Sequence, residues 1–186
     1  IYETNDCDEF IQGGQLESYK FKNKNGILIT TGNEEADEKA QSIKSDLGKI
    51  IFIEQDTFKK TIISIGHRNP LGLSVIGNDI LSTEMGPRGG DEINKIEFGK
   101  NYGWPISSYG EPYGKNLEDY KFKKNHKDYG FKEPIFTFVT AIAPSQILKV
   151  PNDFNKKWKN NFLMASLGSK ALFRLAEFVE RVVHLS

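Results

Sequence analysis

A turn followed by a strand occurs three times along this chain, and this repeat limits the possible folds more than any other feature. The three copies span Asn25–Thr31, Asn78–Glu84 and Asn160–Ser166. Asn-Gly and Asn-Asp pairs tolerate the positive φ of tight turns, and the β-branched or aromatic residues after them favour a pleated strand. We call each copy a cassette and expect all three to form the same element of a repeated unit.

Each cassette has the same kind of neighbours. A short strand is expected before it, another after it, and a fourth apolar strand closes the unit. The strands expected before the cassettes are Gln15–Phe21, Leu71–Ile76 and Gln146–Val150; those after them are Gly48–Ile53, Asp91–Ile96 and Lys170–Leu175; the closing strands are Thr61–Ile65, Ile135–Ile142 and Val179–Leu185. Repeated units of four antiparallel strands predict an all-β fold, the β-propeller.

The number of repeated units does not decide how a complete fold is assembled. A β-sandwich also has many short strands, but repetition of one cassette favours the propeller. Three blades do not close a ring, because propellers usually have about four to eight. We expect residues 1–186 to form a single β-propeller domain or a fragment of one, about half of a six-bladed disc. The remaining blades lie outside this sequence, which we prefer, or come from a second chain in a homodimer that leaves no exposed sheet edges.

Two long polar insertions separate the cassettes. Residues 33–46 are charged and compatible with a short surface helix, and residues 107–132 are rich in tyrosine, lysine, glycine and asparagine. We predict both as loops over one face of the disc, where rigid blades would position functional residues.

Composition excludes several kinds of partner. The chain has 25 Lys and Arg residues and 25 Asp and Glu residues, so no net field draws it to nucleic acid or to an anionic membrane. No run approaches the roughly 18 apolar residues of a membrane span. Cys7 is the only cysteine, which excludes an internal disulfide framework and a cysteine metal cluster. Ile1–Phe10 is acidic and has no signal-peptide core, so we expect the chain to be trimmed at its start.

Three runs in the middle of the chain carry the most specific signal: Gly66–Leu73, Thr83–Asn94 and Gly99–Pro105. Together and in this order they resemble the signature of the glucose/sorbosone dehydrogenase family. The resemblance covers most of the chain. It implies a six-bladed propeller that uses pyrroloquinoline quinone (PQQ) and calcium to oxidise small-molecule sugars, in the periplasm or as a secreted protein.

The turn at Gly86 and Pro87 is the candidate metal site. A proline followed by two glycines forces an irregular turn whose carbonyl oxygens suit calcium. The resemblance implies that the Gly86 and Pro87 carbonyls hold the calcium that bridges to the quinone. It also implies that Glu92 and Tyr102 belong to a second, structural calcium site. The alternative interpretation is that this run only forms a hairpin.

Arg68 and Asn69 are the candidate cofactor-binding residues. The planar guanidinium of an arginine suits carboxylates, and the resemblance implies that both residues contact the quinone. The alternative is an ion pair of Arg68 with Glu84 or Asp91 that ties neighbouring blades. We expect His67 to be structural. The aromatic residues Trp104, Tyr102, Tyr109 and Tyr113 are expected to fill the wedge between blades rather than to form a floor for sugars.

The catalytic histidine of the family has no counterpart in this sequence. The resemblance puts the general base at Ile11 and the preceding substrate-binding aspartate at Phe10, and neither side chain accepts a proton. Loss of a general base slows proton abstraction by roughly 10² to 10⁴. Two further positions depart from the family: Met85 replaces a polar residue, and Gly168 stands where some members have a cofactor-binding lysine.

These features support two hypotheses. The first is a quinone-dependent sugar dehydrogenase, an oxidoreductase that oxidises aldoses by hydride transfer to PQQ, with impaired or absent catalysis. The second is a non-catalytic, calcium-binding propeller that acts as a binding or structural module. Fold alone does not choose between them, because function depends on the site.

Overall fold

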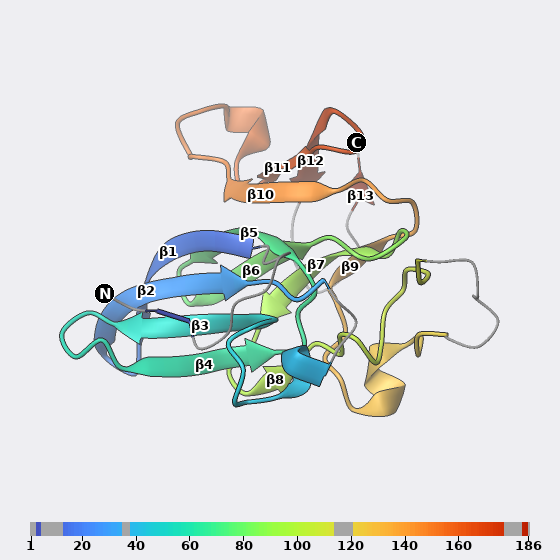
Figure 1. Cartoon of the computed structure of the whole chain (residues 1–186). Helices are drawn as coiled ribbons and strands as arrows, with labels where there is room; N and C mark the ends of the chain where they lie inside the picture. The colour runs from blue at the N-terminus through green and yellow to red at the C-terminus, as the bar shows by residue number, and fades with distance from the viewer. Residues whose placement is uncertain (1–2, 5–12, 35–37, 114–120, 177–183, 186) are drawn as a thin grey trace.

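The computed structural model of the chain describes residues 3–4, 13–34, 38–113, 121–176 and 184–185, and its regular structure is almost entirely strand (Figure 1). The strands form three sheets that follow one another along the chain. The first contains β1 (Gly13–Phe21), β2 (Lys24–Thr31), β3 (Lys49–Glu54), β4 (Lys60–Ile65) and a short β8 (Lys100–Asn101); the second contains β5 (Pro70–Ile76), β6 (Asp79–Glu84), β7 (Asp91–Ile96) and β9 (Phe136–Phe138); the third contains β10 (Pro144–Lys149), β11 (Phe162–Ser166), β12 (Ala171–Ala176) and β13 (His184–Leu185).

The predicted blades are confirmed by this topology. Each sheet contains four antiparallel strands in chain order, to which the first sheet adds β8, and each cassette forms the second strand of its sheet. The chain therefore contains three blades of a β-propeller. We call them the first, second and third blade.

Four details differ from the expected elements. Strand β8 was not predicted and pairs in parallel with β4. Strand β9 is shorter than residues 135–142, because the amides of Ile142 and Ala143 donate to the Asp91 carboxylate at 2.7 and 2.8 Å instead of extending the sheet. The insertions contain 3₁₀ helices η1 (Glu38–Gln41) and η2 (His126–Tyr129), and a third, η3 (Lys156–Trp158), precedes β11. Helix η1 is not confined to the surface, since Ala40 is fully buried.

Equivalent cassette positions make equivalent contacts between blades. The first apolar position after each turn is Ile27, Ile80 or Phe162, and it faces the preceding blade; Ile80 and Phe162 are buried in the two inter-blade cores. Ile27 belongs to the first blade and is 48% exposed. The next position faces the following blade, where Leu28 and Leu81 are buried. Burying such a side chain contributes about 1.5–3 kcal/mol, so these positions hold the blades together.

Polar contacts repeat between the blades as well. The Thr30 hydroxyl donates to the Pro70 carbonyl at 2.9 Å, and the equivalent Thr83 hydroxyl donates to the Ser145 carbonyl. The third cassette has Ala165 at this position, and it is exposed. The second and third blades are also joined by Gln146, whose side chain exchanges two hydrogen bonds with the backbone of Leu73 at 3.0 and 2.8 Å.

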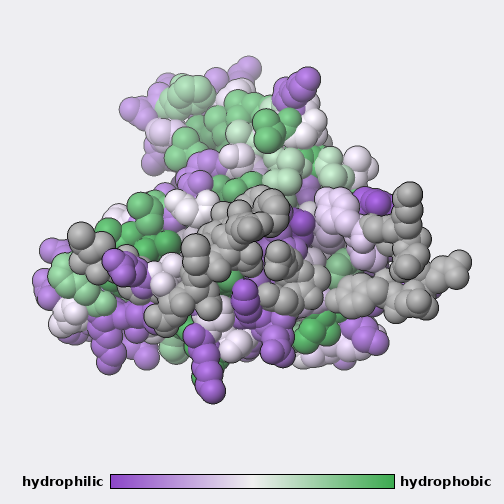
Figure 2. Space-filling view, viewed as in Figure 1, coloured by the Kyte–Doolittle hydropathy of each residue, from purple (hydrophilic) through white to green (hydrophobic). Residues whose placement is uncertain are grey.

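The outer faces of the first and third blades remain apolar and exposed. Leu16 and Ile27 lie on the first, and Leu148 and Leu172 lie on the third, where they are 54% and 63% exposed. Figure 2 shows hydrophobic residues gathered on the third blade, at the top of the view. In the described part of the chain, no helix is long and apolar enough to cross a membrane.

Candidate functional site

The candidate site lies where the loops leave one end of the second blade. Pro70 pairs with Glu84 across β5 and β6, and Glu84 pairs with Glu92 across β6 and β7. The β4–β5 connection, which carries Arg68 and Asn69, therefore emerges beside the β6–β7 loop, which carries Gly86 and Pro87. The register of the sheet thus brings two of the three sequence runs together, Gly66–Leu73 and Thr83–Asn94.

Two buried glutamates form the centre of the site. The amide of Asn94 donates to Glu84 Oε1 at 3.1 Å and to Glu92 Oε2 at 3.2 Å, which holds the two carboxylates side by side. Burial, and then the negative charge of Glu84, raise the pKa of Glu92 well above its ordinary value. A positive charge beside these two glutamates, which we call the Glu84–Glu92 cluster, would therefore stabilise them.

The two neighbouring histidines contact the glutamates differently. His67 Nδ1 lies 2.5 Å from Glu84 Oε1, its Nε2 lies 2.7 Å from the Ser64 hydroxyl, and its ring stacks on Tyr102. It is fully buried, as expected of a structural residue. His126 Nε2 lies 3.6 Å from Glu92 Oε1, and burial lowers the pKa of His126. Near neutral pH, His126 therefore adds no charge beside Glu92.

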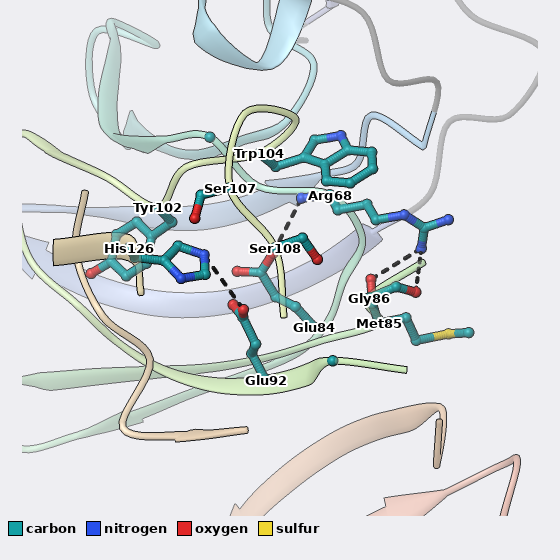
Figure 3. Close-up of a pocket in the computed structure, with 12 residues that line it drawn as sticks. Arg68, Glu84, Met85, Gly86, Glu92, Tyr102, Trp104, Ser107, Ser108 and His126 are labelled. Carbon is teal, nitrogen blue, oxygen red and sulfur yellow. Dashed lines mark hydrogen bonds and ion pairs between the residues drawn. The ribbon is translucent and has the colours of Figure 1, made fainter. Parts of the chain in front are cut away.

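A small cavity lies against Glu92 (Figure 3). Its volume is about 20 Å³, and its lining includes Glu84, Glu92, Tyr102, Ser107, Ser108 and His126. A cavity needs about 10–15 Å³ to hold one water, so this one has room for about one water or one ion. Asn94 Oδ1 and His126 Nδ1 are buried here and have no hydrogen-bond partner among the described residues.

Arg68 is held at the edge of the same site. One guanidinium nitrogen donates to the carbonyls of Met85 at 3.0 Å and Gly86 at 2.9 Å, as Figure 3 shows. The guanidinium carbon lies 5.3 Å from the centre of the Trp104 ring. Only 8% of the residue is exposed, and its buried Nε has no hydrogen-bond partner in the described chain.

The ion pair of Arg68 differs from both predicted alternatives. Its guanidinium lies 3.6 Å from Glu34, whereas Glu84 accepts a bond from the backbone amide of Arg68 at 3.2 Å. The Asp91 carboxylate instead accepts the amides of Gly86, Ile142 and Ala143. Asn69 is fully buried and donates to Glu34 Oε1 at 2.9 Å. Glu34, which the sequence did not single out, thus contacts both candidate cofactor-binding residues.

The two candidate carbonyls of the turn accept hydrogen bonds. The Gly86 carbonyl accepts from Arg68, and the Pro87 carbonyl accepts from the Tyr113 hydroxyl at 2.6 Å. A Cβ at position 86 would lie 2.3 Å from the Gly89 carbonyl oxygen, so only glycine fits this close turn. Each carbonyl oxygen has two lone pairs and therefore keeps capacity for a cation.

The hydroxyl of Tyr102 is used elsewhere. It donates to the Lys95 carbonyl at 2.6 Å and accepts from the Glu97 amide at 2.9 Å. Any contact of Tyr102 with a cation would come through its backbone. Tyr102 is buried in the core between the first and second blades, as predicted for a wedge-filling aromatic. Trp104 instead packs with Ala40 and Phe122 of the insertions, and Tyr113 is 66% exposed.

Comparisons with known proteins agree with the sequence resemblance. The family model described as glucose / sorbosone dehydrogenase matches residues 9–184. This chain belongs to that family. The aldose sugar dehydrogenase YliI of Escherichia coli is 29% identical over 175 residues, which cover 85% of this chain and 45% of that protein. Quinoprotein glucose dehydrogenase B of Acinetobacter calcoaceticus is 42% identical over 66 residues, 34% of this chain and 14% of that protein.

Solved structures of the family share the fold. The crystal structure of the soluble aldose sugar dehydrogenase of Escherichia coli in its apo form superposes with a TM-score of 0.77 and 27% identity, over 93% of this chain and 52% of that one. The chain spans about half the length of such relatives. Phe10 and Ile11, where the family's aspartate and histidine were expected, lie outside the described residues.

Proposed function

We propose that this chain carries part of the site of a quinone-dependent sugar dehydrogenase, with impaired or absent turnover. The observation that carries the proposal is Arg68, a buried guanidinium fixed against the Gly86 carbonyl in a family of sugar dehydrogenases. The quinone of the Acinetobacter calcoaceticus relative, which its name states, supports the choice of cofactor.

The residues present fit a quinone that carries carboxylates. Arg68 has a buried Nε that lacks a hydrogen-bond partner among the described residues, and an added carboxylate would satisfy it. Asn69 lies beside it and would orient the same ligand. When bound, PQQ would accept a hydride from the anomeric carbon of the sugar. Arg68 and Asn69 would bind and orient the cofactor, and the buried Trp104 would limit access of water.

The same turn fits calcium. Among the described residues, no three His, Cys, Asp or Glu side chains are arranged to hold a metal ion. A cation here would therefore use mainly carbonyl, amide and water oxygens, which calcium accepts. The carbonyls of Gly86 and Pro87 would form one site. Glu92, the Asn94 amide oxygen and the backbone of Tyr102 would form the other, where a divalent ion would offset the repulsion between the two glutamates.

The step that this chain lacks is removal of the sugar hydroxyl proton. Oxidation of an aldose to a lactone transfers a hydride from carbon and releases that proton to a base. The resemblance puts Ile11 at the position of the base, and an isoleucine side chain cannot accept the proton. We therefore expect turnover at least about 10²-fold below that of a relative with a histidine there.

Restoring the base tests this proposal. Purified protein with PQQ and calcium should reduce an electron-accepting dye slowly with aldoses, and Phe10→Asp combined with Ile11→His should raise the rate by about 10²-fold or more. Gln12→His is the matched control and should leave the rate unchanged. A parent without any quinone-dependent absorbance change, and a double variant without dye reduction, would together refute the dehydrogenase proposal.

A second candidate function is a non-catalytic calcium-binding propeller, and the Glu84–Glu92 cluster favours it. In this case calcium raises the melting temperature, because it binds the folded state preferentially, whereas quinone has no effect. Glu92→Ala should abolish most of the calcium response, and Glu111→Ala, which removes an exposed carboxylate, should retain it. An equal calcium response in Glu92→Ala would remove Glu92 from the ligands.

Two finer assignments belong to the same proposal. We propose the periplasm or the cell exterior as the compartment, which is the usual one for the family. For this chain we also propose a homodimer in which the apolar outer faces of the first and third blades are covered by those of a second copy. The exposed Ile27 and Leu172 support this pairing.

A further inference from the structure

We propose that Arg88 and Tyr113 form an arm that recognises a carboxylate on the ligand held at Arg68. This inference rests on the proposed function only in placing a ligand beside Arg68. It adds two residues to the site and a chemical requirement for what binds there.

Tyr113 connects the two arginines. Its ring centre lies 6.0 Å from the guanidinium carbon of Arg68 and 5.8 Å from that of Arg88. Its hydroxyl donates to the Pro87 carbonyl at 2.6 Å, which fixes the ring next to the candidate cofactor turn. With 66% of the residue exposed, the ring offers an open surface that a flat ligand or a sugar can contact.

Arg88 lacks a carboxylate partner within the part of the chain that the structure describes. Its backbone pairs with that of Glu111 through two hydrogen bonds of 3.0 Å, so Glu111 is the acidic residue directly opposite Arg88. The Glu111 side chain, however, forms its ion pair with Lys124 at 3.0 Å. The Arg88 side chain is exposed and directed at the Tyr113 ring, and so it remains available for an anion.

A carboxylate fits this arrangement better than a neutral group. Both guanidinium groups beside the Tyr113 ring are positively charged, and they attract an anion bound next to that ring. Guanidinium binds carboxylate through two parallel hydrogen bonds, and the aromatic ring packs against the rest of the ligand. The carboxylate has two possible sources, a bound quinone or a sugar acid used as substrate.

The experiment measures binding at equilibrium and does not depend on turnover. Calorimetric titrations of the calcium-loaded protein use PQQ, glucuronate and glucose as probes; glucuronate and glucose differ in one carboxylate. The variants are Arg88→Gln, Tyr113→Ala and Tyr113→Phe. Lys59→Gln, which removes an exposed charge in the turn between β3 and β4, is the matched control.

The expected result is weaker binding of a carboxylate probe to Arg88→Gln, by about fivefold to thirtyfold, as for loss of one hydrogen-bonded charge. Tyr113→Ala should weaken the binding of the same probe, and Tyr113→Phe should retain most of the affinity. Lys59→Gln should bind the probe with the affinity of the parent. If only the binding of PQQ is weakened, the carboxylate comes from the cofactor. If the binding of glucuronate is weakened, it comes from the sugar. Either outcome supports the proposal.

Two outcomes overturn it. In the first, Arg88→Gln binds every probe within twofold of the parent. In the second, the parent binds neither PQQ nor glucuronate more tightly than glucose. Failure of the proposed function is distinguished separately, because it appears as absent dye reduction even where Arg88-dependent binding is measured.

Discussion

At the scale of single residues, the site is organised around two buried carboxylates that share one amide donor. Glu84 and Glu92 share the Asn94 amide, and the nearest histidine to Glu92 is kept neutral by burial. Burying a charged carboxylate without a counter-charge costs free energy. Such a carboxylate therefore either has a raised pKa and holds a proton, or binds a cation. Stability near neutral pH should therefore depend on what occupies this cluster.

The raised pKa of Glu92 gives a prediction with a defined sign. The folded protein holds a proton on Glu92 at pH values where the unfolded chain, with an ordinary carboxyl pKa, has lost it. With calcium removed by a chelator, the free energy of unfolding should therefore fall as pH rises from about 5 to about 8. Glu92→Gln should flatten this decline, and denaturant unfolding at several pH values measures both. A decline of equal slope in the variant would contradict the assignment to Glu92.

Sequence reasoning identified some site residues and missed others for a physical reason. Arg68, Gly86 and Glu92 lie in runs whose composition already departs from ordinary strands and turns. His126 and Glu34 lie in the polar insertions, where the sequence has no periodicity to place them. Only the folding of these insertions over the second blade brings His126 to Glu92. No local pattern reports such a contact.

At the scale of elements, the second and third blades approach each other closely at Gly72, beside the apolar core that they share. A Cβ at Gly72 in β5 would lie 2.1 Å from the Thr83 hydroxyl and 2.4 Å from the Ser145 carbonyl of the third blade. The absence of a side chain at this position allows the Thr83 hydroxyl to reach Ser145.

Adding one methyl group at this contact should therefore separate the blades. Gly72→Ala should lower the free energy of unfolding by about 1–3 kcal/mol through overpacking. Gly77→Ala is the matched control, since a Cβ there meets no atom within 4 Å, although φ is +61°. We expect the control to lose less, about 1 kcal/mol, from backbone strain alone. Denaturant unfolding of the two variants compares these costs, and an equal loss would argue against the close approach.

The strands themselves were the most predictable part of the chain. Turn pairs and alternating apolar residues set β2, β6 and β11 almost to the residue, because these signals are local. Strand β8 depends on a pairing with β4 that lies some distance away in the sequence, and β9 ends early because Asp91 captures backbone amides. Both depend on tertiary contacts, which override local preference.

At the scale of the molecule, we expect the two outer faces to control association. Both faces expose apolar residues at positions that are buried where two blades meet. Such apolar patches favour contact with a similar surface. The chain on its own should therefore associate in a concentration-dependent way, with a dimer as the first species.

Charged substitutions on these faces provide the measurement. Ile27→Lys combined with Leu172→Lys should shift sedimentation toward a monomer without lowering the melting temperature by more than a few degrees. Ile43→Lys, at a position that is 75% exposed and lies outside the strands of both faces, should leave association unchanged. A parent that sediments as a monomer at all concentrations would rule out the homodimer.

The hydroxyl contact made by Thr30 and Thr83, and replaced by Ala165 in the third cassette, has a consequence for how the array comes apart. Contacts in such a repeat run mainly between nearest neighbours, so opening begins at the ends and propagates inward. The second blade has a partner on both sides and should retain its slowest amide hydrogen exchange in β5 and β6. The first and third blades each have a neighbouring blade on one side among the described residues and should exchange sooner. The loops of the site therefore emerge from the blade whose backbone opens last.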